Sequence, residues 1–244
     1  MTEEPPPRCQ QVAANIAKIR DRITAAAARA GRSSSDITLM AVTKTQPADQ
    51  ILEAYRAGIR SFGENRVQEF QTKCADLEHL QDASFTLIGQ LQSNKVNRAI
   101  ELFSAIHSAD SLRLAERLNA ALERGNRPPL PIAIEINIGD PAKAGLAPGS
   151  PELEQVLLAA QRVPHLRIQG LMTIPPFTEN PEDARPYFRR LRELRDRIAE
   201  RNLPGVGMDM LSMGMSHDFE VAVEEGSTCV RIGTAIFGER PKQI

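Results

Sequence analysis

The chain has 244 residues, and its 30 Lys and Arg against 31 Asp and Glu leave a formal charge of −1, which argues against nucleic-acid or anionic-membrane partners. The length suits a single α/β barrel, which takes about 250 residues. Cys9, Cys74 and Cys229 lie far apart without metal-ligand spacing, which favours a reducing, cytoplasmic compartment and predicts no metal site. No apolar stretch is long enough for a secretory signal or a membrane span.

The order of elements is predicted from apolar periodicity and from turn residues. Residues 1–8 are acidic and proline-rich and predict a flexible tail, whereas residues 9–244 predict one domain. An alanine-rich helix is expected over 9–30, with Gly31 ending it. The expected strands are 38–43, 59–62, 85–88, 104–108, 131–138, 167–172, 209–213 and 228–232. The expected helices between them are 47–57, 64–78, 93–102, 111–125, 150–162, 181–201 and 216–226.

This alternation of strands and helices determines the predicted fold. It favours right-handed βαβ units with a parallel sheet, and eight such units close into a (β/α)8 barrel. An open doubly wound sheet is the alternative, and it usually carries a glycine-rich turn after its first strand. Here the segment 43–50, "TKTQPADQ", contains no glycine. We therefore predict an α/β protein with a single (β/α)8 TIM barrel, to which the helix 9–30 is an extra covering element.

Lys44 directly follows the first predicted strand, and in such barrels function is located where the strands end. Because side chains alternate along a strand, Lys44 shares a face with Met40 and Val42. If that face is the lumen, the amine projects into the barrel mouth. Two interpretations remain open at this point: a lysine whose head lies in water, or a desolvated amine that attacks a carbonyl group.

The second, fourth and fifth strand exits also carry polar residues. In "FGENRVQEF" Glu64 is explained by the dipole of the helix that it is expected to open, and this interpretation leaves open whether Asn65 faces the mouth. His107 has no partner at catalytic spacing, and we interpret it as structural. Glu135 and Asn137 share a face of the fifth strand, so one or both are expected to face the lumen.

The last two strand exits are rich in Gly, Ser and Thr. Ser212, Gly214 and Ser216 surround the turn after the seventh strand, and Gly233 and Thr234 follow the eighth. Barrels often bind phosphate with these two loops, because glycine lets backbone N–H groups approach the anion and hydroxyl groups add donors. A tight turn without a ligand is the alternative interpretation, and the pairing of two such exits favours phosphate.

Arg231 shares strand parity with Cys229, so it is expected to point inward, where its guanidinium needs an acceptor. A ligand ring nitrogen or a buried carboxylate would supply one. An amine on the first strand, an inward arginine and a phosphate cradle together describe a ligand with an aldehyde, a ring nitrogen and a phosphate. Pyridoxal 5′-phosphate (PLP) fits this description, held as a Schiff base on Lys44.

The chain also resembles a known family in six segments: "AVTKTQP", "FGENRVQE", "IGQLQSNK", "EINIGDPAKAG", "GLMTI" and "LSMGMSHDFEVAVEEGSTCVRIGTAIFG". These resemble the YggS/PROSC family of PLP homeostasis proteins and, at the level of the barrel, the N-terminal domain of alanine racemase, a fold-type III PLP barrel. The resemblance implies that Lys44 carries the cofactor covalently and that Arg231 faces the pyridine nitrogen. The cofactor-binding residues expected are Lys44, Asn65, Met172, Ser212, Ser216, Arg231, Gly233 and Thr234, with the phosphate serine left open between Ser212 and Ser216.

Whether the chain is an enzyme is a separate question. Racemases and decarboxylases of this barrel type add a β-domain, and the sequence ends six residues after Gly238. A cationic Arg231 at the ring nitrogen also disfavours a protonated pyridinium, which weakens the electron sink that carbanion chemistry needs. The family resemblance implies the same outcome: a PLP-binding protein of vitamin B6 and amino-acid homeostasis, with PLP-dependent apoenzymes or B6-pathway enzymes as acceptors or donors. We expect a monomer, because the sequence shows no coiled coil and no long exposed apolar stripe that demands a partner.

Two rival functions stay open. A single-domain PLP-dependent amino-acid racemase or lyase needs a base on the other face of the cofactor, for which Lys143, Lys95 and His107 are candidates. A phosphate-binding barrel enzyme without PLP makes Lys44 an aldolase-type base.

Overall fold

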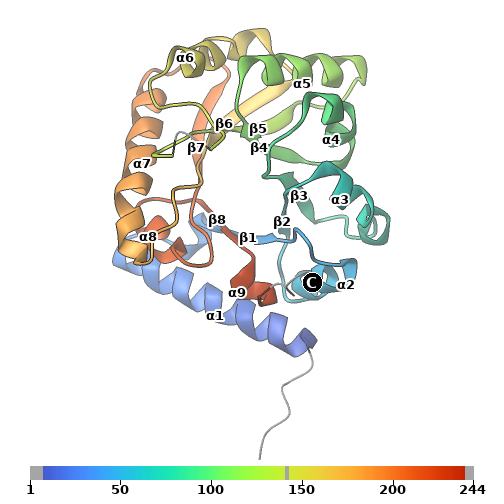
Figure 1. The fold of residues 1–244 in the computed structure, drawn as a ribbon, viewed down its shortest axis with the longest axis vertical. Helices are drawn as coiled ribbons and strands as arrows, with labels where there is room; N and C mark the ends of the chain where they lie inside the picture. Colours follow the sequence, from blue (N-terminus) through green and yellow to red (C-terminus); the bar gives the residue numbers. More distant parts are fainter. Residues whose placement is uncertain (1–7, 141–142, 240–244) are drawn as a thin grey trace, which may run out of the picture.

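A closed barrel of eight parallel strands forms the centre of the molecule (Figure 1). The computed structural model describes residues 8–140 and 143–239. Each strand pairs with the next in chain order, and β8 closes the ring by pairing with β1, so that Met40 lies beside Arg231. The strands are β1 (Thr38–Val42), β2 (Ser61–Glu64), β3 (Ser84–Leu87), β4 (Ala105–Ala109), β5 (Leu130–Glu135), β6 (Leu166–Met172), β7 (Val206–Ser212) and β8 (Cys229–Ile232). The predicted (β/α)8 barrel is confirmed.

Helices surround the strands, as Figure 1 shows. The α-helices are α1 (Arg8–Arg29), α2 (Ala48–Arg56), α3 (Val67–Gln71), α4 (Val96–Leu102), α5 (Leu112–Arg124), α6 (Pro151–Leu158), α7 (Arg185–Glu200), α8 (Phe219–Glu224) and α9 (Thr234–Phe237). The 3-10 helices are η1 (Ser34–Asp36), η2 (Cys74–Leu77), η3 (Ser93–Lys95), η4 (Ala160–Arg162) and η5 (Pro181–Ala184).

The predicted boundaries were wrong where a loop interrupts an apolar pattern. The helix expected over 64–78 begins only at Val67, because β2 extends through Glu64, and it is divided into α3 and η2. The strand expected over 131–138 ends at Glu135, because the chain turns there and Ile136 pairs with Leu146 in an isolated bridge. The helix expected over 216–226 begins only at Phe219. Apolar periodicity does not distinguish a short helix from the turns that flank it.

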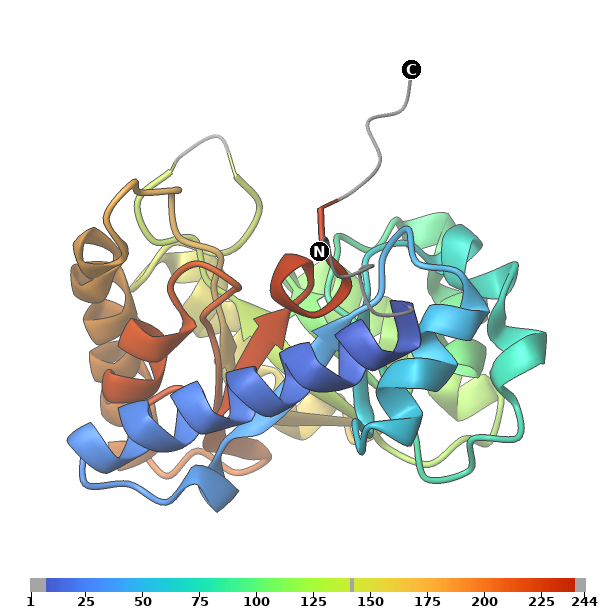
Figure 2. The same cartoon turned by 90° about the horizontal axis from the view of Figure 1, so that it is seen from below.

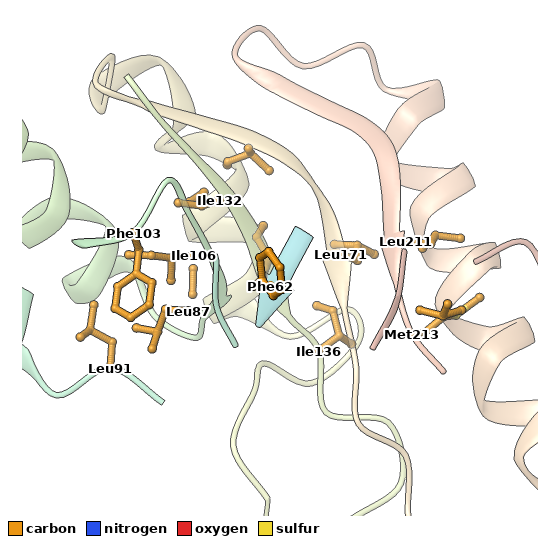
Figure 3. Close-up of a cluster of buried hydrophobic side chains, with 14 of the residues drawn as sticks. Phe62, Leu87, Leu91, Phe103, Ile106, Ile132, Ile136, Leu171, Leu211 and Met213 are labelled. Carbon is orange, nitrogen blue, oxygen red and sulfur yellow. The ribbon is translucent and has the colours of Figure 1, made fainter. Parts of the chain in front are cut away.

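Two apolar clusters stabilise the barrel. The larger one lies between the strands and the helices, and Figure 3 shows part of it around Phe62, Leu87, Ile106 and Leu211. The smaller one lies inside the barrel and consists of Met40, Val42, Ile88 and Cys229. Because successive strand residues point to opposite faces, this division shows which positions face the lumen.

Helix α1 occupies the space outside β8 and β1, beside α9 (Figure 2). Its buried residues recur every three or four positions and join the same cluster as the outer faces of these strands: Val12, Ile16, Ile19, Ile23, Ala26 and Ala27. Since α9 after β8 spans only four residues, α1 supplies the cover that a longer helix gives in other barrels. The predicted role of the leading helix as a cover is therefore confirmed.

Two predictions about the ends of the chain and about membranes remain. A flexible tail was expected over residues 1–8. Residues 1–7 lie outside the described residues, and Arg8 already belongs to α1. Within residues 8–140 and 143–239, no helix is both long enough and apolar enough to cross a membrane.

Candidate functional site

A cavity of about 260 Å³ opens where the strands end. Its lining comes from the ends of six of the eight strands and the segments that follow them: Val42, Lys44, Gln46, Asn65, Ile88, Ile174, Met215, Ser216, His217, Arg231, Gly233, Thr234 and Gly238. This volume is slightly below the range of about 300–1,000 Å³ that is usual for ligand pockets, and it suits one small molecule. Of the eight predicted site residues, six line the cavity, and Met172 and Ser212 do not.

A larger depression of about 670 Å³ lies at the opposite end of the barrel, beside α1 and the starts of β1, β2 and β3. Its two arginines already have partners within the fold. Arg20 donates to the carbonyl oxygens of Ala57 and Gly58, and Arg60 forms an ion pair with Asp82. Because barrels carry their chemistry where the strands end, the smaller cavity is the candidate site.

Lys44 reaches the cavity through strand alternation, as predicted. Met40 and Val42 belong to the apolar cluster inside the barrel, and Lys44 continues that face just beyond the end of β1. Val42 and Ile88 form apolar walls of the same cavity. The amine-bearing residue therefore forms part of the wall of an open-mouthed, partly apolar site.

Arg231 forms the floor of this cavity and is 3% exposed. Its Nη1 donates to Ser212 Oγ over 2.8 Å, and its Nη2 donates to the carbonyl oxygen of Thr173 over 2.7 Å. The predicted inward orientation is confirmed, and its acceptors within the protein are a hydroxyl and a carbonyl group. These bonds use two of the five N–H donors of the guanidinium and fix its plane.

Ser212 and Met172 lie beneath the cavity, paired in register at the ends of β7 and β6. Both are fully buried. Ser212 Oγ lies 3.2 Å from His107 Nδ1, and burial, together with the charge of Arg231, lowers the pKa of His107 to about 3. His107 is thus a neutral structural residue, and Ser212 contacts the arginine rather than the cavity.

The turns after β7 and β8 form the opposite wall. Gly233 and Thr234 line the cavity where α9 begins, and the first N–H groups of a helix have no partner within the helix. Ser216 Oγ accepts a hydrogen bond from the amide of Ala235 over 3.2 Å, which places this hydroxyl beside the same turn. Asp218 Oδ1 accepts from the amide of Met215 over 2.6 Å and holds the β7 turn in place. Donor groups therefore converge on one side of the cavity.

Asn65 is fixed by a close approach of two loops. A Cβ on Gly89 would lie 2.2 Å from the carbonyl oxygen and 2.6 Å from Oδ1 of Asn65. Only glycine fits against Asn65 at this distance, so the loop after β3 determines where the Asn65 side chain enters the cavity wall.

Glu135 and Asn137 have different roles, although they were expected to share a strand face. Glu135, at the end of β5, is 8% exposed. Burial and repulsion from Asp110 raise its pKa to about 7, although the positive charge of Arg231 acts to lower it. The side chain of Asn137 instead donates to the carbonyl oxygens of Asp140 and Lys143 over 2.7 and 2.6 Å. Asn137 therefore shapes a loop.

Some cavity residues could not be predicted from the sequence because they lie on loops without a periodic pattern. Ile174 and His217 line the cavity, and the ring of His217 lies 5.4 Å from that of Phe177, which is 79% exposed. Ile174 lies in the proline-rich loop after β6 and His217 in the turn after β7, and no pattern in the sequence marks either side chain as facing the cavity.

The expectation for Glu64 was wrong. It does not open a helix; it is fully buried at the end of β2, and its Oε1 lies 2.8 Å from Lys73 Nζ. Among the described residues no group of three His, Cys, Asp or Glu side chains is arranged to hold a metal ion.

Comparison with known sequences identifies the chain's relatives. The family described as "Alanine racemase, N-terminal domain" matches residues 10–241. A pyridoxal phosphate homeostasis protein of Aquifex aeolicus is 44% identical over 226 residues, covering 92% of this chain and 96% of that protein. The protein of the same name from Escherichia coli is 44% identical over 238 residues, covering 94% and 97%.

Solved structures agree with the sequence relatives. PipY of Synechococcus elongatus, solved with PLP bound, is 36% identical, has a TM-score of 0.82 and is matched over 93% of this chain and 100% of its own. Alanine racemase of Streptomyces coelicolor is 19% identical with a TM-score of 0.70; the match covers 96% of this chain and 59% of the racemase, a likeness of fold alone. On this identity, coverage and fold, the chain belongs to the family of pyridoxal phosphate homeostasis proteins, which share the barrel of the alanine racemase N-terminal domain.

Proposed function

We propose that this chain binds PLP at the mouth of the barrel as a Schiff base on Lys44 and serves as a carrier or regulator of the cofactor in vitamin B6 and amino-acid homeostasis. One observation supports this most strongly: Lys44, Arg231 and the turn of Gly233 and Thr234 line a single small cavity. The relatives named for PLP homeostasis and the PLP-bound structure of PipY support the same ligand.

The residues present fit the three functional groups of PLP. Lys44 supplies an amine for the aldehyde, and Arg231 supplies N–H donors for the ring nitrogen. Gly233, Thr234 and Ser216 supply amide and hydroxyl donors for the phosphate. When bound, PLP supplies a reactive aldehyde and an electron-withdrawing ring. The chain's own contribution is to bind the phosphate, orient the ring and hold the aldehyde carbon beside the Lys44 amine.

The surroundings of the cavity favour a carrier over a racemase or lyase. Of the three candidate second bases, His107 lies beneath the floor with its pKa lowered to about 3. Lys143 Nζ donates to the carbonyl oxygen of Pro175 over 3.2 Å. The third candidate, Lys95, lies in η3. None of the three candidates is among the described residues that line the cavity. Arg231 also keeps the ring nitrogen unprotonated, since its guanidinium donates hydrogen bonds and accepts none.

The proposal extends to partners. A carrier takes PLP from an enzyme that makes it and gives it to an apoenzyme that needs it, so we propose PLP-dependent apoenzymes and B6-pathway enzymes as acceptors and donors. The cavity opens at the end of the barrel where the strands exit, which is the face such a partner must approach.

Absorbance of the purified protein tests PLP binding. We expect the wild-type protein with added PLP to show a Schiff-base band that Lys44→Ala lacks, while Lys18→Ala, on the exposed side of α1, keeps it. Borohydride reduction followed by peptide mass spectrometry should place the label on Lys44. A colourless wild-type protein that retains no added PLP contradicts the proposal.

A second experiment separates carrier from enzyme. The PLP-loaded protein is incubated with L- and D-amino acids in deuterated water, and Cα deuterium is followed by NMR. We expect exchange no faster than with free PLP. Exchange at turnover rates of about 1 s⁻¹ or more, typical of enzymes, identifies a racemase or lyase.

A further inference from the structure

Lys73 is a buried lysine just outside the site. It lies between α3 and η2 in the segment "FQTKCADL" and is 7% exposed. Lysine is almost never this buried without partners, because its ammonium group carries three N–H donors that each need an acceptor. Its acceptors therefore show what this residue holds in place.

The acceptors are the carbonyl oxygens on both sides of the cofactor lysine. Lys73 Nζ donates to the carbonyl oxygens of Thr43 over 2.9 Å and of Gln46 over 3.1 Å, and it lies 2.8 Å from Glu64 Oε1. The amide of Gln46 also donates to the carbonyl oxygen of Thr43 over 3.0 Å. The turn 43–46, which carries Lys44, is thus closed around the Lys73 ammonium.

Two carboxylates complete this network. Thr43 Oγ1 donates to Glu64 Oε1 over 2.6 Å, and Glu69 Oε1 accepts from the amide of Thr45. Thr45 has a φ of 64°, a left-handed conformation that a β-branched residue rarely adopts. Backbone strain of this kind persists only where surrounding contacts determine the conformation, and here those contacts come from Glu69 and Lys73.

The network contacts the turn 43–46 from the outer face of the barrel, opposite the lumen. Thr43 continues the outer face of β1, to which Ala41 belongs, whereas Lys44 continues the inner face. Glu64 shares strand parity with Phe62, whose ring lies in the outer cluster. None of Thr43, Glu64 and Lys73 is among the described residues that line the cavity. The network therefore acts on the backbone of Lys44 without touching the ligand.

We propose that Lys73, with Glu64 and Thr43, positions Lys44 for covalent capture of PLP. This inference rests on the proposed function, in which Lys44 binds the cofactor. In that step the neutral Lys44 amine forms a C=N bond with the aldehyde carbon, and the aldehyde oxygen leaves as water with the two amine hydrogens. A fixed turn presents the amine at the aldehyde from the start, so the network speeds capture without strengthening the contacts to phosphate or ring.

The test compares variants by two measurements. The first is the rate at which the Schiff-base band appears when apoprotein is mixed with PLP in a stopped-flow instrument. The second is the affinity for PLP in a Lys44→Ala background, where only non-covalent contacts remain. Lys73→Met combined with Glu64→Gln removes both buried charges together, because removing one alone leaves the other unpaired. Lys18→Met, which changes an exposed lysine of α1, is the matched control.

We expect the double variant to capture PLP at least tenfold more slowly, with its non-covalent affinity within twofold of the Lys44→Ala parent. Hydrogen exchange of the apoprotein gives a readout without the cofactor: the amides of Thr45 and Gln46 should exchange at least tenfold faster than in Lys18→Met. If the ion pair has only a structural role, its removal lowers the urea midpoint of the double variant but leaves the capture rate within twofold of wild type. That result overturns the inference.

If the double variant does not fold, the capture rates of the Thr43→Val and Thr43→Ser variants test the inference instead. Val keeps the shape of the Thr43 side chain but loses the hydroxyl bonded to Glu64, whereas Ser keeps that hydroxyl and loses one methyl group. We expect Val to slow capture several-fold and Ser to stay near wild type; equal rates for Val and wild type overturn the inference. Failure of the proposed function looks different, since the wild-type protein itself then shows no Schiff-base band.

Discussion

Arg231 Nη1 donates to Ser212 Oγ over 2.8 Å, directly beneath the cavity that Arg231 lines. The serine in turn lies 3.2 Å from His107, so strands β8, β7 and β4 meet at one buried polar point. The guanidinium plane is thereby fixed by the barrel itself, with or without a ligand. Such preorganisation lowers the entropy cost of binding a flat ring against it.

The two serines after β7 should respond differently to removal of the hydroxyl. Ser216→Ala should lower PLP affinity about tenfold or more, because a hydrogen bond to a charged group contributes roughly 1.5–3 kcal/mol. Ser212→Ala should instead lower the free energy of unfolding by about 1–3 kcal/mol, since it leaves a buried Arg231 donor unpaired. Equilibrium dialysis with PLP and urea unfolding of the apoprotein measure the two effects. A larger loss of PLP affinity in Ser212→Ala contradicts this assignment.

Arg231→Ala and Thr234→Ala should both weaken cofactor retention and leave the barrel folded. Arg231→Ala also unfolds at lower urea, because Ser212 and the Thr173 carbonyl oxygen lose their donors. Thr234 is partly exposed at the start of α9, so its substitution should shift the urea midpoint little. The half-life of bound PLP during gel filtration, with far-UV circular dichroism as the folding check, measures retention. Unchanged half-lives in both variants would remove the ring-nitrogen and phosphate assignments.

Glu135 should make the apoprotein less stable as the pH rises. Its folded-state pKa is raised from 4.5 to about 7, so between these values the folded state binds more protons than the unfolded chain, and the free energy of unfolding falls with rising pH. Glu135→Gln removes this dependence. The variant should match wild type near pH 4.5 and exceed it by about 3 kcal/mol at pH 8.

Urea unfolding of both proteins from pH 4.5 to 8 provides the measurement. The comparison must be made against the variant, because His107 gives a slope of the opposite sign. Its pKa is lowered to about 3, so the unfolded chain binds more protons at acidic pH, and stability is lost as the pH falls below the unfolded value of 6.5. A difference between the two proteins that does not grow from pH 4.5 to pH 8 contradicts the prediction.

Gly89→Ala should damage the cofactor site through Asn65. The added Cβ would lie 2.2 Å from the Asn65 carbonyl oxygen, so the loop after β2 must move, at a cost of about 1–3 kcal/mol in stability. PLP affinity should fall as well, because Asn65 lines the cavity. Gly149→Ala is the control: its φ of 72° makes that substitution costly for the backbone as well, but no atom lies within 4 Å of its added Cβ and Gly149 does not line the cavity. Equal PLP affinity of the two variants goes against a role for the Asn65 loop.

Much of the fold could be predicted because its determinants are local. The alternation of short apolar runs with amphipathic segments gives the (β/α)8 order, and strand parity alone places Lys44 and Arg231 on the inner face. Six of the eight predicted site residues line the cavity for this reason, since all six lie at or just beyond strand ends. The PLP assignment itself depended further on family resemblance, because an amine, an arginine and a glycine-rich turn are each common alone.

Other features depend on contacts between segments far apart in the sequence. The sequence gives no reason to prefer Ser212 or Ser216 as the residue that faces the cavity. The register of β7 against β6 and β8 places Ser212 beneath the cavity, and Ser216 lines its wall. In the sequence Glu64 looks like an acidic residue in the first turn of a helix. In the structure it forms a buried ion pair with Lys73, nine residues later. By itself, the sequence determined the barrel and the inward direction of its reactive residues. Tertiary packing alone decided which polar groups meet, because hydrogen bonds between distant segments leave no periodic signal in the chain.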